Sequence, residues 1–198
     1  MYKISSYLKI NIFILFFFGS QIFSLNEQNS THHLKTIIFG AGCFWSVEKK
    51  FQETFGVVDV KSGYADGKNI KPVYTEIIKR ENKFNPNNYA EAVKVTYNSN
   101  KTNLENLLKT FFEMHDPTQI NRQGNDIGVQ YRSLILTLSD EENSLANEIK
   151  NEYQNLLFKE GYGSVKTSIK KFTNFYLAES FHQDYLKKNP NGYCPDHS

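Results

Sequence analysis

The sequence is compatible with a single α+β domain that follows a separate N-terminal segment. With 198 residues, the chain is long enough for one domain with a substantial core. Short runs rich in β-branched residues predict strands, and two segments with apolar residues at helical spacing predict amphipathic helices. Together they predict the mixture of strands and helices that an α+β fold requires.

The N-terminal segment differs in kind from the rest of the chain. A basic start is followed by the apolar run 10–18 and by small residues between Gly19 and Ser24. This pattern is typical of a secretory signal peptide, and the run is shorter than the ~20 apolar residues of a membrane span. We expect residues 1–24 to direct export (periplasmic, secreted or secretory pathway), with a retained membrane anchor as the alternative, and residues 25–34 to be a linker.

The first predicted element of the domain carries the most distinctive chemistry. Residues 36–39 predict a short buried strand, which a glycine turn joins to a helix that opens at Cys43. Backbone N–H groups at a helix N-terminus favour a thiolate, and thiolate is the nucleophilic form of cysteine. Phe44 and Trp45 would add an apolar wall, although an inert buried cysteine is the alternative. The helix is expected to continue through Phe55, with Glu48 in solvent.

The next elements place a carboxylate on a strand. Residues 57–61 predict a strand and residues 62–67 a turn, whereas 72–78 are ambiguous between strand and helix. Residues 89–97 predict another strand, on which alternation puts Glu91 on the inward face. Burial would raise the pKa of its carboxyl, as a proton donor near neutral pH requires, whereas a solvent-exposed edge position is the alternative.

The second half of the domain contains two helices and a long polar loop. Residues 103–114 form an amphipathic pattern, and 139–159 follow a capping box with apolar positions that include Leu156. Between them lies the polar stretch 115–128, whose length favours a functional role, and Asp126 and Tyr131 lie at its exit. Further strands are expected at residues 131–137 and 165–169, and a mobile tail at 187–198 carries Cys194.

The two cysteines leave three functional interpretations open. In an exported protein they could form a structural disulfide, in a domain with a binding role. A cysteine hydrolase would need a histidine base beside Cys43, and His115 and His182 are the candidates. A redox enzyme would use Cys43 as the attacking thiolate and Cys194 as the resolving thiol, which accounts best for one cysteine at a helix start and another on a tail.

Several motifs together resemble the A-type peptide methionine sulfoxide reductases, and the resemblance covers residues 35–194. They are Gly42-Cys-Phe-Trp45, Gly63-Tyr-Ala65, Ala90-Glu91, His115-Asp-Pro-Thr-Gln119, Asn121-Arg-Gln-Gly-Asn-Asp126, Gln130-Tyr-Arg-Ser133, His182-Gln-Asp-Tyr185 and Asn189-Pro-Asn-Gly-Tyr-Cys194. The resemblance implies an oxidoreductase that reduces the S epimer of methionine sulfoxide, free or protein-bound, to methionine. It also implies an α+β fold: a two-layer mixed sheet with packed helices around a βαβ (ferredoxin-like) core, with long loops.

The resemblance also implies a role for each site residue. Cys43 would attack the sulfoxide sulfur and become a sulfenic acid, Glu91 would protonate the oxygen, and Cys194 would form a disulfide that a thioredoxin-like dithiol reduces. Tyr74, Tyr131 and Asp126 would bind the oxygen, and Phe44 and Trp45 would hold the S-methyl group. The resemblance implies no metal or organic cofactor, and the protein is expected to be a monomer. No nucleic acid partner is expected, because the net charge is only +2.

This chain departs from the usual family pattern at four positions. Ser46 and Asp66 stand where glycine is common, Tyr89 where histidine often occurs, and Leu177 where proline is frequent. No further cysteine follows Cys194, so a cycle with two cysteines is predicted. Ser46 and Tyr89 are the departures expected to bear on pocket width and on the protonation of Glu91, and so on rate and substrate preference.

Overall fold

A computed structural model of the chain describes residues 33–193. The expectations for the signal peptide, for most of the linker and for Cys194 concern residues outside this range. The chain divides into two units, residues 1–34 and 35–198, and the second contains the elements that form the site. Within the described range, no helix is both long enough and apolar enough to cross a bilayer.

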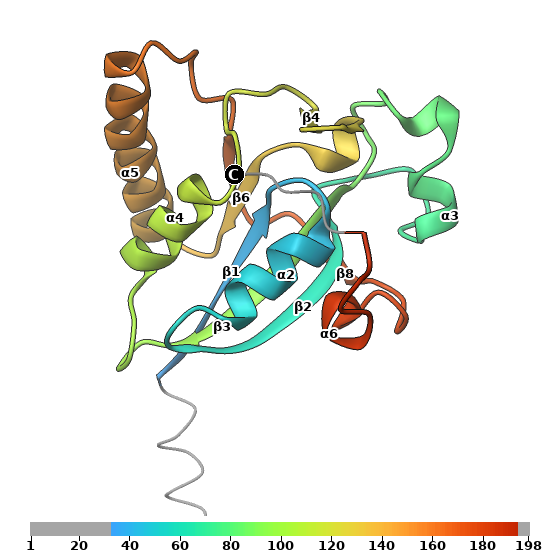
Figure 1. Cartoon of the computed structure of the whole chain (residues 1–198), viewed down its shortest axis with the longest axis horizontal. Coiled ribbons are helices and arrows are strands. Elements are labelled where there is room, and N and C mark those ends of the chain that lie inside the picture. Colours follow the sequence, from blue (N-terminus) through green and yellow to red (C-terminus); the bar gives the residue numbers. More distant parts are fainter. Residues whose placement is uncertain (1–32, 194–198) are drawn as a thin grey trace, which may run out of the picture. The chain divides into compact units, whose positions relative to one another are not determined.

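Six strands form one mixed sheet in the order β7-β6-β1-β3-β2-β8 (Figure 1). They are β1 (Leu34–Gly40), β2 (Val57–Ala65), β3 (Ala90–Asn98), β6 (Leu134–Thr137), β7 (Ser168–Lys171) and β8 (Phe175–Leu177). The β1–β6, β2–β3 and β2–β8 pairs are antiparallel, whereas β6 and β7 are parallel. A small antiparallel pair, β4 (Arg122–Gln123) and β5 (Asp126–Ile127), lies in the stretch predicted to be a loop.

Three helices form the second layer of the fold: α2 (Phe44–Gln52), α4 (Leu104–Glu113) and α5 (Asp140–Lys159). The short helices α3 (Tyr74–Ile77) and α6 (Tyr185–Lys188) and the 3₁₀ turns Arg80–Asn82 and Val129–Tyr131 lie in the connecting segments. Helix α2 packs along β2 and β3, and α5 packs on α4 and next to β6 and β7 (Figure 1). The predicted α+β class with a mixed sheet and packed helices is therefore confirmed, while the ferredoxin-like description stays a prediction.

The larger hydrophobic core lies between this helical layer and one face of the sheet. Strand β1 contributes Phe39, whose ring stacks on Phe51 of α2 at 4.9 Å and on Phe111 of α4 at 5.0 Å between centroids. The neighbouring Ile38 belongs to a smaller cluster of buried residues that includes Leu134 and Leu136. Neighbouring residues of β1 thus pack on opposite faces of the sheet, which fixes this strand in the core. The chain runs from the end of the strand through a short turn to Cys43 and α2.

Four predictions about these elements were wrong. Helix α2 ends at Gln52, which leaves Phe55 76% exposed, and Leu156 on α5 is also exposed. Strand β2 continues through the expected turn to Ala65 because β3 and β8 pair with it on both sides. Glu48 is only 1% exposed, although it was expected in solvent.

Candidate active site

Cys43 is the residue that links β1 to α2. It occupies the N-cap position of α2 and follows Gly42, whose φ of 94° favours glycine. The cysteine is 7% exposed and opens into a cavity of about 120 Å³. The cavity is lined by Cys43, Phe44, Trp45, Tyr74, Glu91, Asp126, Tyr131 and Tyr193. The fold thus brings together every predicted site residue that lies in the described range.

Glu91 reaches this cavity from β3. Its side chain is on the inward face, as the alternation predicts, and the residue is 3% exposed. The backbone N–H of Phe44 donates a hydrogen bond of 3.2 Å to Oε2 of Glu91. Burial raises the pKa of Glu91 to about 8, with the Phe44 N–H opposing and the charge of Asp126 adding to the rise. The carboxyl therefore carries a proton at neutral pH and can donate it.

Burial and the helix start have opposite effects on the pKa of the Cys43 thiol. Burial, followed by the charge of Glu91, raises its pKa far above the ordinary value, and the charge of Asp126 contributes in the same direction. The backbone N–H groups of Trp45 and Ser46 lower the pKa, but they do not compensate for the loss of water. The N–H groups at the helix start thus favour the thiolate as expected, but burial outweighs them because the helix start lies inside the protein.

Two phenols and a carboxylate complete the polar side of the cavity. Tyr74 is the first residue of α3, Tyr131 ends a 3₁₀ turn, and Asp126 lies in β5. Burial raises the pKa of both phenols, and the charge of Glu91 is the next cause in each case. Both tyrosines therefore keep their protons and can donate hydrogen bonds to an oxygen that gains negative charge.

Tyr193 also lines the cavity, although no prediction from the sequence singled it out. Its phenol donates a hydrogen bond of 3.5 Å to Oδ1 of Asp126. The signal that could have identified it is its place directly before Cys194 in the C-terminal motif. Tyr193 is the last described residue, and Cys194 lies outside the described range.

The apolar side of the cavity is formed by Phe44 and Trp45. The indole of Trp45 stacks on Tyr185 of α6, with ring centroids 3.7 Å apart and planes 14° apart. Its Nε1–H donates a hydrogen bond of 3.1 Å to Nδ1 of His182. The Phe44 ring lies 5.9 Å from that of Tyr64 and 5.0 Å from that of His182, centroid to centroid. Residues from the end of the domain therefore hold this aromatic wall in place.

The residues that depart from the family pattern do not line the cavity. Ser46 donates a hydrogen bond of 2.9 Å to the carbonyl oxygen of Cys43 and so stabilises the first turn of α2. Tyr89 packs edge to face with Tyr176 at 5.6 Å, and Leu177 lies on the exposed edge strand β8.

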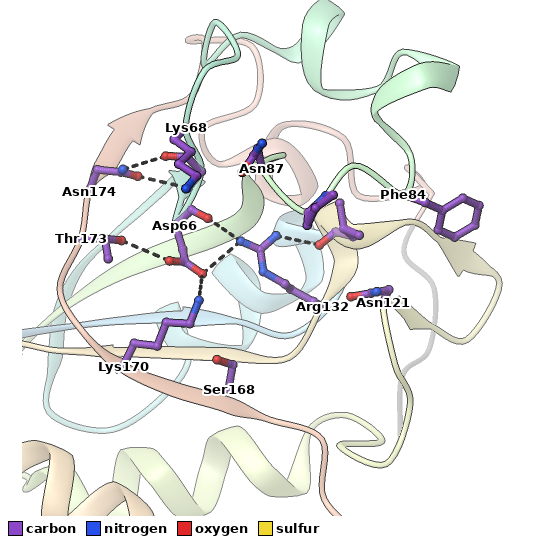
Figure 2. A pocket seen from close by; sticks show the side chains of 13 residues that line it. Asp66, Lys68, Phe84, Asn87, Asn121, Arg132, Ser168, Lys170, Thr173 and Asn174 are labelled. Carbon is purple, nitrogen blue, oxygen red and sulfur yellow. Dashed lines mark hydrogen bonds and ion pairs between the residues drawn. The ribbon is translucent and has the colours of Figure 1, made fainter.

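Asp66 belongs to a different and larger pocket of about 600 Å³ (Figure 2). Its carboxylate lies 3.3 Å from the guanidinium of Arg132 and 2.7 Å from Nζ of Lys170. Arg132 also donates to the carbonyl oxygens of Asn88 and Val129. None of the predicted site residues lines this pocket. We therefore assign Asp66 a structural role, in which it compensates the charge of the largely buried Arg132.

The histidines are not placed as a hydrolase would require. Neither His115 nor His182 lines the Cys43 cavity. Both ring nitrogens of His115 are hydrogen-bonded elsewhere, Nδ1 with the Phe111 carbonyl at 2.7 Å and Nε2 with the Ser133 hydroxyl at 2.8 Å. Over residues 33–193, no group of three or more His, Cys, Asp or Glu side chains is arranged to hold a metal ion.

Comparison with known sequences places this site in a family. Residues 35–198 match the family peptide methionine sulfoxide reductase. The peptide methionine sulfoxide reductase MsrA of Corynebacterium kroppenstedtii is 43% identical over 169 residues, which cover 83% of this chain and 74% of that protein. The human mitochondrial peptide methionine sulfoxide reductase is 44% identical over 157 residues, which cover 79% of this chain and 65% of that protein.

Solved structures with the same fold agree with this placement. Methionine sulfoxide reductase A of Corynebacterium diphtheriae superposes with a TM-score of 0.76 at 40% identity, covering 84% of this chain and 80% of that one. Reduced Mxr1 of Saccharomyces cerevisiae gives a TM-score of 0.74 at 36% identity, and the match covers 85% of this chain and 93% of Mxr1. The crystal structure of Mxr1 in complex with Trx2 gives a TM-score of 0.55 at 27% identity, and the match covers 85% of this chain and 91% of that one.

Proposed function

Because this chain belongs to the peptide methionine sulfoxide reductase family and is an oxidoreductase acting on peptide methionine sulfoxide, we propose that Cys43 reduces the S epimer with Glu91 as proton donor. The observation that carries the proposal is the cavity itself, in which a cysteine thiol and a protonated carboxyl lie together. The two phenols beside them can hydrogen-bond the sulfoxide oxygen, and Phe44 and Trp45 can hold the methyl group.

The first step transfers the sulfoxide oxygen to the enzyme. The sulfur of Cys43 attacks the sulfoxide sulfur while Glu91 protonates the oxygen, which weakens the sulfur–oxygen bond. The oxygen then forms a bond to Cys43 while the sulfur–sulfur bond made in the attack and the original sulfur–oxygen bond break, so that methionine leaves and Cys43 becomes a sulfenic acid. Of the two protons that enter the step, one from the thiol and one from Glu91, one stays on the S–OH and the other returns to the carboxyl of Glu91. Because the pKa of the Cys43 thiol is raised, the attack depends on a sulfoxide already activated by Glu91 and the tyrosines.

The second step regenerates the thiol. The Cys194 thiol displaces the hydroxyl of the sulfenic acid as water and leaves a Cys43–Cys194 disulfide, which a thioredoxin-like dithiol reduces by exchange. The Mxr1–Trx2 complex supports a reductant of this class. We propose that the enzyme works as a monomer on oxidised proteins or peptides, without nucleic acid, metal or organic cofactor. A structural disulfide in a binding domain is not favoured.

Export is a separate part of the proposal. The basic start and the short apolar run support a signal peptide at residues 1–24. N-terminal sequencing of the protein recovered from the exported fraction tests this part, and we expect a mature chain that begins after residues 20–24. Recovery of the uncleaved chain from the cytosol would contradict it.

Incubation with the separated sulfoxide epimers tests the proposed reaction. The protein, a dithiol and either the S or the R epimer are combined, and the methionine formed is measured. Methionine is expected from the S epimer, with little or none from the R epimer. No product from the S epimer would overturn the proposed function, and equal rates with both would overturn its stereochemistry.

A further inference from the structure

We propose that His182 is a positioning residue, which holds the indole of Trp45 at the orientation in which it forms the methyl-binding wall. The inference rests on the proposed function, because it assumes that Trp45 contacts the substrate. His182 itself does not line the cavity. It acts through the side chains that do.

The hydrogen bond between the two residues defines the protonation of the imidazole. An indole N–H can only donate, so Nδ1 of His182, 3.1 Å from Nε1 of Trp45, must accept. The proton of the neutral ring is therefore on Nε2. With Tyr185 stacked on the indole at 3.7 Å, Trp45 is held by one directional bond and one ring contact.

His182 also contacts the other walls of the cavity. Its ring centroid lies 5.0 Å from that of Phe44 and 4.7 Å from that of Tyr74. Glu179, three residues earlier in the chain, accepts a hydrogen bond of 2.9 Å from the backbone N–H of Tyr74. The short segment that includes Glu179 and His182 therefore supports both the apolar and the polar sides of the site.

A comparison with His115 shows that stability alone does not explain His182. The buried His115 has partners for both ring nitrogens. In contrast, the buried Nε2 of His182 has no hydrogen-bond partner among the described residues, since Oε2 of Glu179 lies 4.0 Å away. An unpaired buried N–H is costly, so an apolar side chain would serve the core better. The feature of His182 that an apolar residue lacks is the acceptor for Trp45.

The acceptor exists only while the imidazole is neutral. Burial lowers the pKa of His182, and the charge of Glu179 opposes this. The other groups around the ring are the Tyr74 phenol and the uncharged rings of Phe44, Trp45 and Phe181. Trp45 should therefore keep its hydrogen bond at neutral pH and lose it in acid, below the ordinary histidine pKa of about 6.5.

Trp45 is the only tryptophan, so its indole N–H gives a single resonance in a ¹⁵N spectrum of the reduced protein. We expect this resonance to be protected from solvent exchange at pH 7 and to shift in acid as His182 titrates. His182→Leu should abolish the protection and the titration. His182→Gln, whose amide oxygen can accept from the indole, should restore the protection without the titration. A titration that persists in either variant would overturn the proposal.

Kinetics with the S epimer provide the second readout. His182→Leu is expected to raise KM about three- to tenfold with a smaller change in kcat, as loss of one hydrogen bond in a binding wall predicts. His182→Gln should remain within about twofold of the wild type. In a cycle with Trp45→Phe, the effect of His182→Leu should disappear, because the bond is already absent. Independent effects in the double variant would contradict the assignment.

The indole resonance and the reductase assay distinguish a failure of the positioning role of His182 from a failure of the proposed function. The indole resonance is measured on the intact wild-type protein without substrate, so it tests the Trp45–His182 bond even where a variant fails to fold. An unprotected resonance at pH 7 in the wild type would overturn the positioning role. Absence of reductase activity together with a protected indole would overturn the proposed function instead.

Discussion

The backbone N–H of Phe44 donates a hydrogen bond of 3.2 Å to the carboxyl of Glu91. The residue that follows Cys43 on α2 therefore orients the carboxyl on β3, and the two groups of the proposed reaction are held by one contact between helix and sheet. Because the bond comes from the backbone, it is independent of the Phe44 side chain, which is left to form part of the apolar wall.

The two cysteines should fail at different stages of the cycle. Cys43→Ser should abolish reduction, because a hydroxyl cannot form the sulfenic acid. Cys194→Ser should release about one methionine per enzyme and then stop with a thioredoxin-type donor, because resolution is lost. Single-turnover assays with quantified methionine separate the two. Full turnover of the Cys194 variant with that donor would eliminate its resolving role.

Glu91→Gln should slow the chemical step by roughly 10²–10⁴, the usual contribution of a general acid. A glutamine can still accept the hydrogen bond from Phe44, so binding should change much less than kcat. The pH profile provides the control. The pKa of Glu91 is raised to about 8, so wild-type kcat should fall as the pH rises above that value, whereas the variant should lack this fall. An unchanged rate would remove Glu91 from the role of donor.

The same carboxyl should make the stability of the fold depend on pH. Its pKa is about 8 in the folded protein and 4.5 ordinarily, so the folded state binds the extra proton between these values. The free energy of unfolding should therefore decrease as pH rises from about 4.5 to 8, by up to about 1.4 kcal/mol per unit from this group. Urea unfolding of the reduced protein at several pH values measures the slope, which Glu91→Gln should reduce. Parallel curves for the two proteins would contradict the shift.

Asp66→Asn should lower stability without affecting the site. The substitution removes the charge that faces Arg132 at 3.3 Å, while asparagine tolerates the local φ of 53°. We expect a loss of about 1–3 kcal/mol in the free energy of unfolding. Asp59→Asn is the matched control, because its pair with Lys61 is exposed and should contribute less than about 1 kcal/mol. Activity per folded molecule should be unchanged, and equal stability losses in the two variants would refute the structural role of Asp66.

Local patterns identified the elements that depend on their own sequence. Helices α4 and α5 follow from apolar spacing and from their N-caps, Asn103 and Ser139, whose side chains accept the backbone N–H groups of Asn106 and Glu142. Alternation along β3 placed Glu91 inward, and the motif around Cys43 located the thiol. These inferences succeeded because neighbours a few residues apart determine caps and periodicity.

The sequence by itself determined most of the residues that meet at the site, with Tyr193 as the exception. Only the tertiary structure decided how these residues are held and charged. The helix start at Cys43 favours a thiolate, whereas burial of the residue raises the pKa of the thiol against that contribution. Glu48 is buried against expectation, and Trp45 is held by His182, 137 residues later in the chain. Desolvation and long-range contacts depend on how distant segments pack, and no local pattern contains that information.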